Sequence, residues 1–140
     1  MSERLEVADR LHSAAIHLLR SAAKSDVQSG QGPARLSALS VLVFGGPKTL
    51  GQLAAIERVK PPTMTRIVAG LKQSGLAKIE SEKGDARKKI ISVTARGGRV
   101  LQEARKKRIQ SLVENLERLD DSEVRTLHKA SDLIEQMLRS

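Results

Sequence analysis

Residues 49–93 decide the fold, and they read TLGQLAAIERVKPPTMTRIVAGLKQSGLAKIESEKGDARKKIISV. Thr49 and Gln52 have the spacing of a capping box, in which each side chain satisfies a backbone N–H at the start of a helix. This pattern predicts a short helix that breaks just before Pro61, because a residue that precedes proline is pushed out of helical dihedral angles. Pro61 then starts a second helix, which runs to about Gln73.

The second of these helices is expected to have two different faces. Its inward residues recur at i, i+3, i+4 and i+7 of the helical repeat: Met64, Ile67, Val68 and Leu71. Its outward face is short, polar and basic: Pro62, Arg66, Ala69 and Gln73, flanked by Thr63, Gly70, Thr65 and Lys72. A helix that enters the major groove of duplex DNA needs such a face, because compact residues allow close approach and an arginine can donate two hydrogen bonds to guanine.

A charged hairpin is expected directly after this helix. Gly75 is placed to end the helix, and Leu76–Ser81 and Lys88–Val93 have the composition of two strands. Between them lies the loop of residues 82–85, where Gly84 is available for a positive φ angle. Two helices joined by a tight turn and followed by a hairpin predict a winged helix-turn-helix lobe, in a chain that is mainly α with a small β-hairpin wing.

The tip of the hairpin is strongly basic, since residues 83–89 read KGDARKK. An arginine on a narrow projection, here Arg87, suits a minor groove, where the negative potential of DNA is focused. Asp85 stands two residues earlier, and we expect it to orient the guanidinium of Arg87 rather than to bind DNA. A merely solvated turn is the alternative interpretation of the same residues.

Helices are also predicted on both sides of the lobe. An apolar stripe from Leu5 to Ala22 predicts a first helix of about twenty residues, and a flexible, turn-rich linker over residues 25–32 follows it. Another helix begins at Pro33. After the hairpin, Thr94 is expected to cap a long helix, and Asp120 begins a last one with a second capping-box pattern.

These elements suggest one domain over residues 1–140, with residues 33–99 as the winged lobe. Residues 5–32 and 100–140 would then be dimerisation helices. Their apolar stripes lie outside the lobe, and such stripes require a partner surface. The alternative is that they pack on each other within one chain.

The chain is basic, and its charge is not spread evenly. It has 25 Lys and Arg against 16 Asp and Glu, and residues 60–108 alone hold 14 basic and 4 acidic side chains. The rest of the chain is nearly neutral. A localised basic field attracts polyanions through counterion release, which makes nucleic acid the leading partner and an anionic membrane surface the lesser one.

Several classes of function are excluded by what the sequence lacks. It has no Cys, which excludes disulfides, thiolate metal sites and Cys nucleophiles, and Phe44 is its sole aromatic residue, which excludes base-stacking platforms. His12 and His17 are five residues apart and His128 is distant, so they lack the spacing of a helical metal pair. We find no catalytic motif, and we therefore expect no enzyme, no cofactor and no metal.

The first twenty residues are rich in charge, and no apolar run approaches the roughly 18 residues that a membrane-spanning helix needs. We expect a soluble, non-secreted, cytoplasmic protein without a membrane partner.

Five stretches of the chain resemble the MarR family of bacterial transcriptional regulators. They are TLGQLA at 49–54, PPTMTRIV at 61–68, LKQSGL at 71–76, GDARKK at 84–89 and SVTARGGR at 92–99. The likeness extends from about residue 5 to about residue 138, and the Asp-x-Arg motif of the wing is among its more specific marks.

This resemblance implies a homodimer with intertwined terminal helices, two winged lobes and binding to pseudo-palindromic promoter DNA. It also implies that Arg87 is the arginine of the wing and that Thr63, Thr65 and Arg66 lie on the recognition helix. The sequence departs from the family pattern in two respects. Lys60 stands where the family often has a capping Ser, and the aromatic or Cys residues with which many members sense phenolic compounds or oxidants are absent apart from Phe44.

The sequence therefore predicts a sequence-specific regulator that binds double-stranded DNA, acting as a ligand-responsive repressor. The predicted DNA contacts are polar, basic or compact residues of the recognition helix and the wing: Lys60, Pro62, Thr63, Thr65, Arg66, Gln73, Lys83, Arg87, Lys88 and Lys89. The alternatives are an activator, a DNA-organising protein without sequence preference, a winged-helix module for protein interaction, and a helical dimer that stores a metal or ligand. The basic wing favours DNA, because an interaction module has no need of Arg87 beside two lysines.

Overall fold

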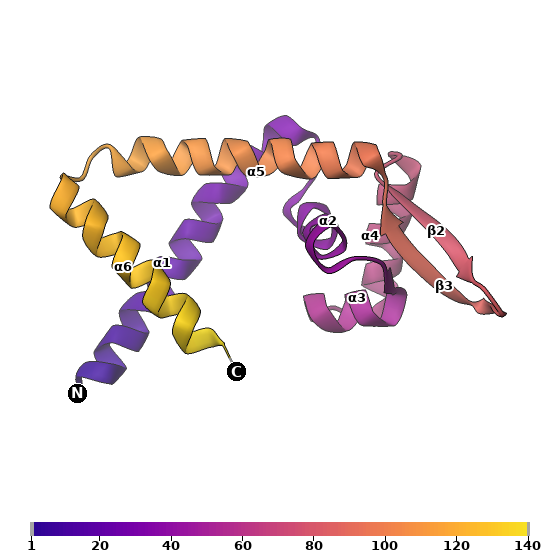
Figure 1. Cartoon of the computed structure of the whole chain (residues 1–140), viewed down its shortest axis with the longest axis horizontal. Helices are drawn as coiled ribbons and strands as arrows, with labels where there is room; N and C mark the ends of the chain where they lie inside the picture. Colours follow the sequence, from indigo (N-terminus) through magenta and orange to yellow (C-terminus); the bar gives the residue numbers. More distant parts are fainter. Residues whose placement is uncertain (1, 140) are drawn as a thin grey trace. The chain divides into compact units, whose positions relative to one another are not determined.

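The computed structural model describes residues 2–139, which are mainly helical (Figure 1). In chain order the elements are α1 (Glu3–Ser25), the 3-10 helix η1 (Asp26–Ser29), α2 (Pro33–Gly45), β1 (Lys48–Thr49), α3 (Leu50–Glu57), α4 (Pro61–Gln73), β2 (Ala77–Glu82), β3 (Asp85–Val93), α5 (Ala95–Leu116) and α6 (Asp121–Leu138). The predicted fold class is confirmed. The chain forms two compact units, one that ends at Arg108 and one that begins at Ile109.

The predicted start signals of α3 and α4 are confirmed. The hydroxyl of Thr49 accepts a hydrogen bond from the backbone N–H of Gln52 at 3.1 Å, and the amide oxygen of Gln52 accepts one from the N–H of Thr49 at 2.9 Å. Helix α4 has no side-chain cap at Lys60 and begins with Pro61, whose ring holds φ at a helical value. Beyond its end, Gly75 has φ 75°, a left-handed conformation that glycine adopts without strain.

An aliphatic core holds the winged lobe together. Its fully buried side chains come from α2, α3, α4, the sheet and the residue that precedes it: Leu39, Leu53, Met64, Leu71, Leu76 and Ile91. Because α4 buries Met64, Val68 and Leu71, its opposite side is left facing solvent. The core therefore fixes which face of α4 is available to a partner.

The sheet is antiparallel and has the strand order β1-β3-β2. The sequence interpretation missed β1, which has only two residues, and placed the start of the last strand at Lys88, which was wrong. That strand begins at Asp85, opposite Glu82. Residues 85–87 are all exposed, so they lack the apolar alternation that marks a strand. The tight turn at Gly84, with φ 90°, brings Asp85 opposite Glu82, and a register shift separates this pair from the pair Ser81–Lys89.

Close packing joins the wing to the start of α5. Gly97 is buried, and a side chain there would collide with the backbone carbonyl of Leu76 and with Val93. Gly70 is likewise buried, and a side chain there would meet the guanidinium of Arg35. The expectation that Gly70 flanks the outer face of α4 was therefore wrong.

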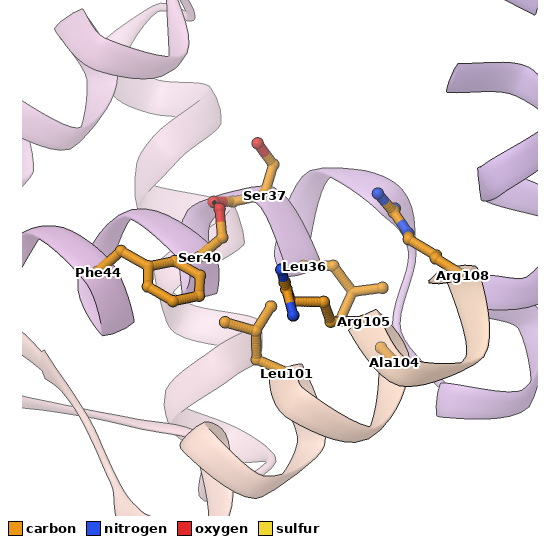
Figure 2. A pocket seen from close by; sticks show the side chains of 8 residues that line it. All are labelled: Leu36, Ser37, Ser40, Phe44, Leu101, Ala104, Arg105 and Arg108. Carbon is orange, nitrogen blue, oxygen red and sulfur yellow. Dashed lines mark hydrogen bonds between the residues drawn. The ribbon is translucent and has the colours of Figure 1, made fainter. Parts of the chain in front are cut away.

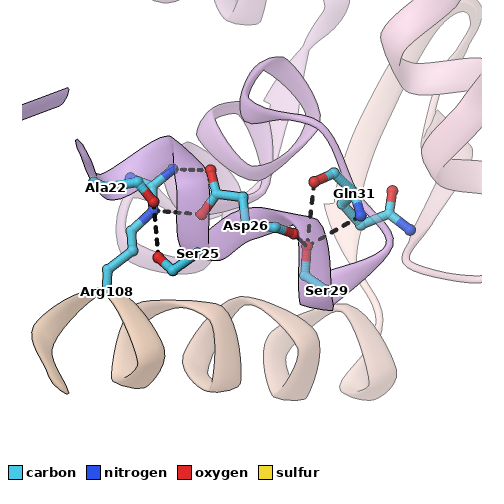
Figure 3. A network of polar contacts seen from close by, with 6 residues as sticks. All are labelled: Ala22, Ser25, Asp26, Ser29, Gln31 and Arg108. Carbon is cyan, nitrogen blue, oxygen red and sulfur yellow. Dashed lines mark hydrogen bonds and ion pairs between the residues drawn. The ribbon is translucent and has the colours of Figure 1, made fainter. Parts of the chain in front are cut away.

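Residues 25–32 form a structured corner rather than the flexible linker that we expected (Figure 3). They include η1, where the hydroxyl of Ser29 donates to the carbonyl of Asp26 at 2.6 Å and accepts from the N–H of Gln31 at 3.0 Å. Asp26 is 2% exposed, and among residues 2–139 no other charged residue is buried. Polar composition suggested a loop, but the segment buries Asp26, whose carboxylate is paired with Arg108 of α5.

Helices α1 and α6 contain no buried residue. Large apolar side chains are exposed on both: Leu5, Val7, Leu18 and Leu19 on α1, and Val124, Leu127, Leu133, Met137 and Leu138 on α6. The predicted capping box at the start of α6 is present, with Asp120 and Glu123 exchanging hydrogen bonds of 2.8 and 3.0 Å. Among residues 2–139, every helix is too short or too polar to span a bilayer.

Candidate nucleic-acid interface

The outer face of α4 carries the predicted contacts of the recognition helix. Pro62, Thr65, Arg66 and Gln73 are exposed, Lys60 is exposed at the N-cap position, and Thr63 is half-buried. The face follows from the helical repeat, because residues two positions apart, such as Arg66 and Val68, lie on nearly opposite sides of a helix, and α4 buries Met64, Val68 and Leu71. The solvent side of α4 therefore has compact side chains at its N-terminal end and longer ones, including Arg66 and Gln73, further along.

Thr65 is partly committed within the helix. Its hydroxyl donates a hydrogen bond to the carbonyl of Pro61 at 3.0 Å. The side chain therefore offers a partner its methyl group and the lone pairs of its oxygen rather than a proton. Arg66, in contrast, makes no hydrogen bond or ion pair with the described residues, so all the donors of its guanidinium are available.

The wing places the other predicted residues on an exposed hairpin (Figure 1). Lys83, Asp85 and Arg87 are exposed, as are Lys88 and Lys89. Here the structure differs from the expected role of Asp85: its carboxylate accepts a hydrogen bond from the backbone N–H of Arg87 at 3.0 Å, not from the guanidinium. Asp85 thus fixes the backbone from which Arg87 projects.

The pleat of β3 divides the basic residues of the wing between two faces. Lys89 shares the face of Ile91, two residues further along, and Lys88 lies on the other face; the register shift between Lys89 and Asp85 interrupts this alternation at Arg87. On the face of Lys89 and Ile91 a groove of about 570 Å³ runs between α4 and the wing, and its lining includes Thr65, Gln73 and Lys89. The structure therefore brings Thr65, Gln73 and Lys89 together, whereas Lys88 lies on the other face.

Lys72 also lines this groove and is exposed, but it was not among the predicted contacts. The helical repeat placed Lys72 beside the outer face of α4, so the signal was present in the sequence. What the sequence lacked was the position of the wing, which turns this flank of α4 into one wall of the groove.

Ion pairs reduce the charge that the wing presents. Lys88 pairs with Glu82 at 3.3 Å and Lys78 with Glu80 at 3.0 Å. Among residues 2–139, Lys83 and Arg87 take part in no ion pair, like Arg66 on α4. Lys60 and Lys89 are also in no ion pair, so Lys88 is the predicted basic contact whose charge an ion pair within the described residues offsets.

The basic excess of residues 60–108 is not confined to the helix and the wing. Six of its 14 basic side chains lie on α5: Arg96, Arg99, Arg105, Lys106, Lys107 and Arg108. Charge counted along the sequence therefore overstates the charge of the candidate interface.

A pocket of about 320 Å³ lies between α2 and α5 (Figure 2). It is lined by apolar side chains, two hydroxyls and two arginines: Leu36, Ser37, Ser40, Phe44, Leu101, Ala104, Arg105 and Arg108. The hydroxyl of Ser37 also donates to the carboxylate of Glu57 at 2.8 Å. The sequence gave no sign of this pocket, because its two walls are more than fifty residues apart in the chain.

The described residues contain no group of three or more His, Asp or Glu side chains that could hold a metal ion. His12, His17 and His128 are exposed on helices.

Helices α3 and α4, the turn between them and the antiparallel wing define a winged helix-turn-helix protein. No family model matches the chain. It is 36% identical over 132 residues to HTH-type transcriptional regulator ML2140 of Mycobacterium leprae, covering 94% of this chain and 92% of that relative. The chain belongs to the HTH-type transcriptional regulators.

Solved structures agree on the fold. A MarR family protein from Bacillus stearothermophilus superimposes with a TM-score of 0.82 at 24% identity, with 99% of this chain and 98% of that one covered. Wild-type MarR from E. coli, in its apo form, gives a TM-score of 0.80 at 18% identity, with 94% of this chain and 96% of that one covered. The resemblance noted from the sequence is confirmed.

Proposed function

We propose that two copies of this chain bind a pseudo-palindromic promoter site in double-stranded DNA and repress transcription there. One observation carries the proposal: α4 buries its apolar face in the core and leaves Thr65, Arg66 and Gln73 exposed, beside a wing that carries Arg87. An α-helix fits the major groove of B-DNA, which is about 12 Å wide. The names of the relatives as transcriptional regulators support this proposal.

On the recognition helix, base reading is assigned to the middle of the outer face. Arg66 donates two hydrogen bonds to guanine, and Thr65 contacts a thymine methyl group or accepts a hydrogen bond. Pro62 and Thr63 are compact enough for close approach, while Lys60 and Gln73 at the two ends contact the backbone of the DNA.

On the wing, Arg87 enters the adjacent minor groove and Lys83 contacts phosphate. Lys88 and Lys89 add phosphate contacts. Lys88 gives up its ion pair with Glu82 when it binds phosphate. Asp85 contributes indirectly, through its bond to the backbone of Arg87.

Dimerisation is assigned to the exposed apolar side chains of α1 and α6. A second copy of the chain supplies the surface that such side chains require, and twofold symmetry places two recognition helices about 34 Å apart, one turn of DNA. A palindromic site then contacts both lobes in the same way.

Response to a small molecule is assigned to the pocket between α2 and α5. Its volume, about 320 Å³, and its mixture of apolar walls with a few polar groups are typical of a small-ligand site. Arg105, which is in no ion pair with the described residues, favours an anion with an apolar body, whereas the charge of Arg108 is already paired with Asp26. Such a ligand releases the DNA only if it binds the DNA-free arrangement of the lobes more tightly than the DNA-bound one.

The test is fluorescence anisotropy with a DNA duplex from the region upstream of the gene that encodes this chain. Arg66→Ala and Arg87→Ala should each cost about 1–3 kcal/mol of binding, and wild-type affinity should fall steeply as salt rises. Arg99→Ala on α5 is the matched control, an exposed arginine outside the proposed contacts, and it should change affinity much less.

The competing functions give different results in the same assay. Equal affinity for a scrambled duplex would indicate a DNA-organising protein without sequence preference. Binding that does not change with salt, or no binding at all, would contradict the proposal and favour a protein-interaction module.

A further inference from the structure

The corner between α1 and α2 carries a polar contact that DNA binding does not use. Asp26 on η1 and Arg108 on α5 are 82 residues apart in the chain, and they meet through two parallel hydrogen bonds (Figure 3). The Nε of Arg108 donates to Oδ1 at 2.7 Å and its terminal nitrogen to Oδ2 at 2.5 Å. Side-on pairing of this kind fixes orientation as well as distance.

This pair differs from the other ion pairs of the described residues. The pairs Glu6–Arg10, Lys78–Glu80 and Glu82–Lys88 are exposed and join residues of one helix or one hairpin. In the fourth pair the side chain of Asp26 is 2% exposed and that of Arg108 34%. The hydrogen bond with Asp26 is also the main reason why the pKa of the Arg108 guanidinium is raised above its ordinary value.

The place of the pair in the fold gives it a mechanical consequence. No residue of α1 is buried, so core packing does not hold the direction of that helix. Its C-terminal end leads directly into η1. The hydroxyl of Ser29 stabilises η1 through its hydrogen bonds with the carbonyl of Asp26 and the N–H of Gln31. The link from this corner to α5 therefore restrains the angle between α1 and the lobe.

We propose that the Asp26–Arg108 pair is a positioning clasp that fixes the angle between α1 and the winged lobe, and that it thereby sets the separation of the two lobes in the dimer. The second half rests on the proposed dimer. From Arg108 back to the start of α5 the helix is a lever of roughly 20 Å at 1.5 Å per residue. A tilt of about 10° over that lever would displace each lobe by roughly 3–4 Å, comparable with one base pair of DNA.

The test measures distances between spin labels by double electron–electron resonance. The chain has no Cys, so introduced cysteines are labelled uniquely. The labels are introduced by Ser13→Cys and Ala55→Cys. Ser13 is exposed on α1, and Ala55 is exposed on α3, outside the proposed DNA contacts. The doubly labelled chain, diluted with unlabelled protein, reports the angle within one protomer, and the chain labelled at Ala55→Cys alone reports the separation of the lobes in a dimer.

Each label set is combined with Asp26→Asn or Arg108→Lys, which keep some hydrogen bonding but lose the side-on ion pair. Ile91→Val, a core change away from the corner, is the control for lost stability alone. The clasp predicts a shift or broadening of roughly 3 Å or more within the protomer for both clasp variants, and none for the control.

The outcomes separate the inference from the proposed function. An unchanged intramolecular distance distribution in folded Asp26→Asn and Arg108→Lys overturns the clasp. Equal broadening in Ile91→Val overturns it too, since general loosening would then be the cause. A wild-type chain without any intermolecular dipolar signal contradicts the dimer, and with it the lobe separation, while the intramolecular arm still decides whether the clasp holds the angle.

Discussion

Two polar, turn-rich segments of this chain have opposite structural roles. Residues 25–32 consist mainly of Ser, Gln and Gly with one Asp, and the wing tip, residues 82–88, consists of charged residues with one Gly and one Ala. In the first, Asp26 is buried and clamped by Arg108; in the second, every side chain is exposed. The difference lies in a partner far along the chain, so local polarity does not show whether a turn supports the fold or serves a ligand.

The largest expected effect comes from breaking the clasp from the α5 side. Arg108→Met removes the partner of a carboxylate that is 2% exposed, and an unpaired buried charge costs about 3–5 kcal/mol. Urea denaturation at neutral pH measures the loss. Asp26→Leu combined with Arg108→Met removes both charges and should restore most of the stability.

A loss below about 1 kcal/mol in Arg108→Met would place the pair among exposed ion pairs, whose contribution is of that size. The corner and the wing tip would then be energetically alike, and the contrast between them would disappear.

The sequence predicts those elements whose signals are local. Thr49 and Asp120 begin capping boxes, Pro61 opens α4 and Gly84 makes the turn of the wing, and each signal involves residues within one turn of helix or hairpin. The corner has no such signal, because the partner of Asp26 lies 82 residues away.

In the candidate site, too, some features follow from local sequence signals and others depend on the folded structure. The outer face of α4 follows from the helical repeat, so Arg66 could be placed on it from the sequence alone. The pairing of Lys88 with Glu82 and the bond from Asp85 to a backbone N–H depend on the hairpin as folded. The sequence could therefore predict which residues are basic, but not which of them are left without an ion pair.

A second prediction concerns the base of the wing, where the hairpin meets α5. Gly97→Ala would drive a methyl group into the carbonyl of Leu76 and should cost about 1–3 kcal/mol. Gly98→Ala is the matched control one residue along, with no atom within 4 Å of the added carbon. Gly98→Ala should be neutral or stabilise the helix by up to about 1 kcal/mol.

Thermal unfolding of the two glycine variants checks this difference. If both changed stability equally, the base of the wing would be as loosely packed as its tip, and the wing would have no rigid anchor on α5.

A third prediction concerns Gly84, in the turn at the tip of the wing. Gly84 has φ 90°, so Gly84→Ala should strain the turn by about 1 kcal/mol. Because the tip is exposed and can open locally, most of this strain should appear as faster hydrogen exchange of the hairpin amides and less as a lower global stability. Hydrogen-exchange mass spectrometry, with the amides of α4 as the internal reference, measures the effect. Slower or unchanged exchange in the hairpin would show that the turn is not strained by a side chain.

The smallest expected effect on stability is also the most informative about the wing. Asp85→Ala removes an exposed side chain, so the free energy of unfolding should change by less than about 0.5 kcal/mol. Its affinity for the duplex should nevertheless fall, because Asp85 accepts the backbone N–H from which Arg87 projects. Asp85→Asn distinguishes the two possible roles of the carboxylate. An asparagine oxygen still accepts a backbone N–H two residues on, so Asn should retain most of the affinity if Asp85 acts through the backbone. If Asn binds the duplex as weakly as Ala, the charge of Asp85 acts on the guanidinium of Arg87, as the sequence alone had indicated.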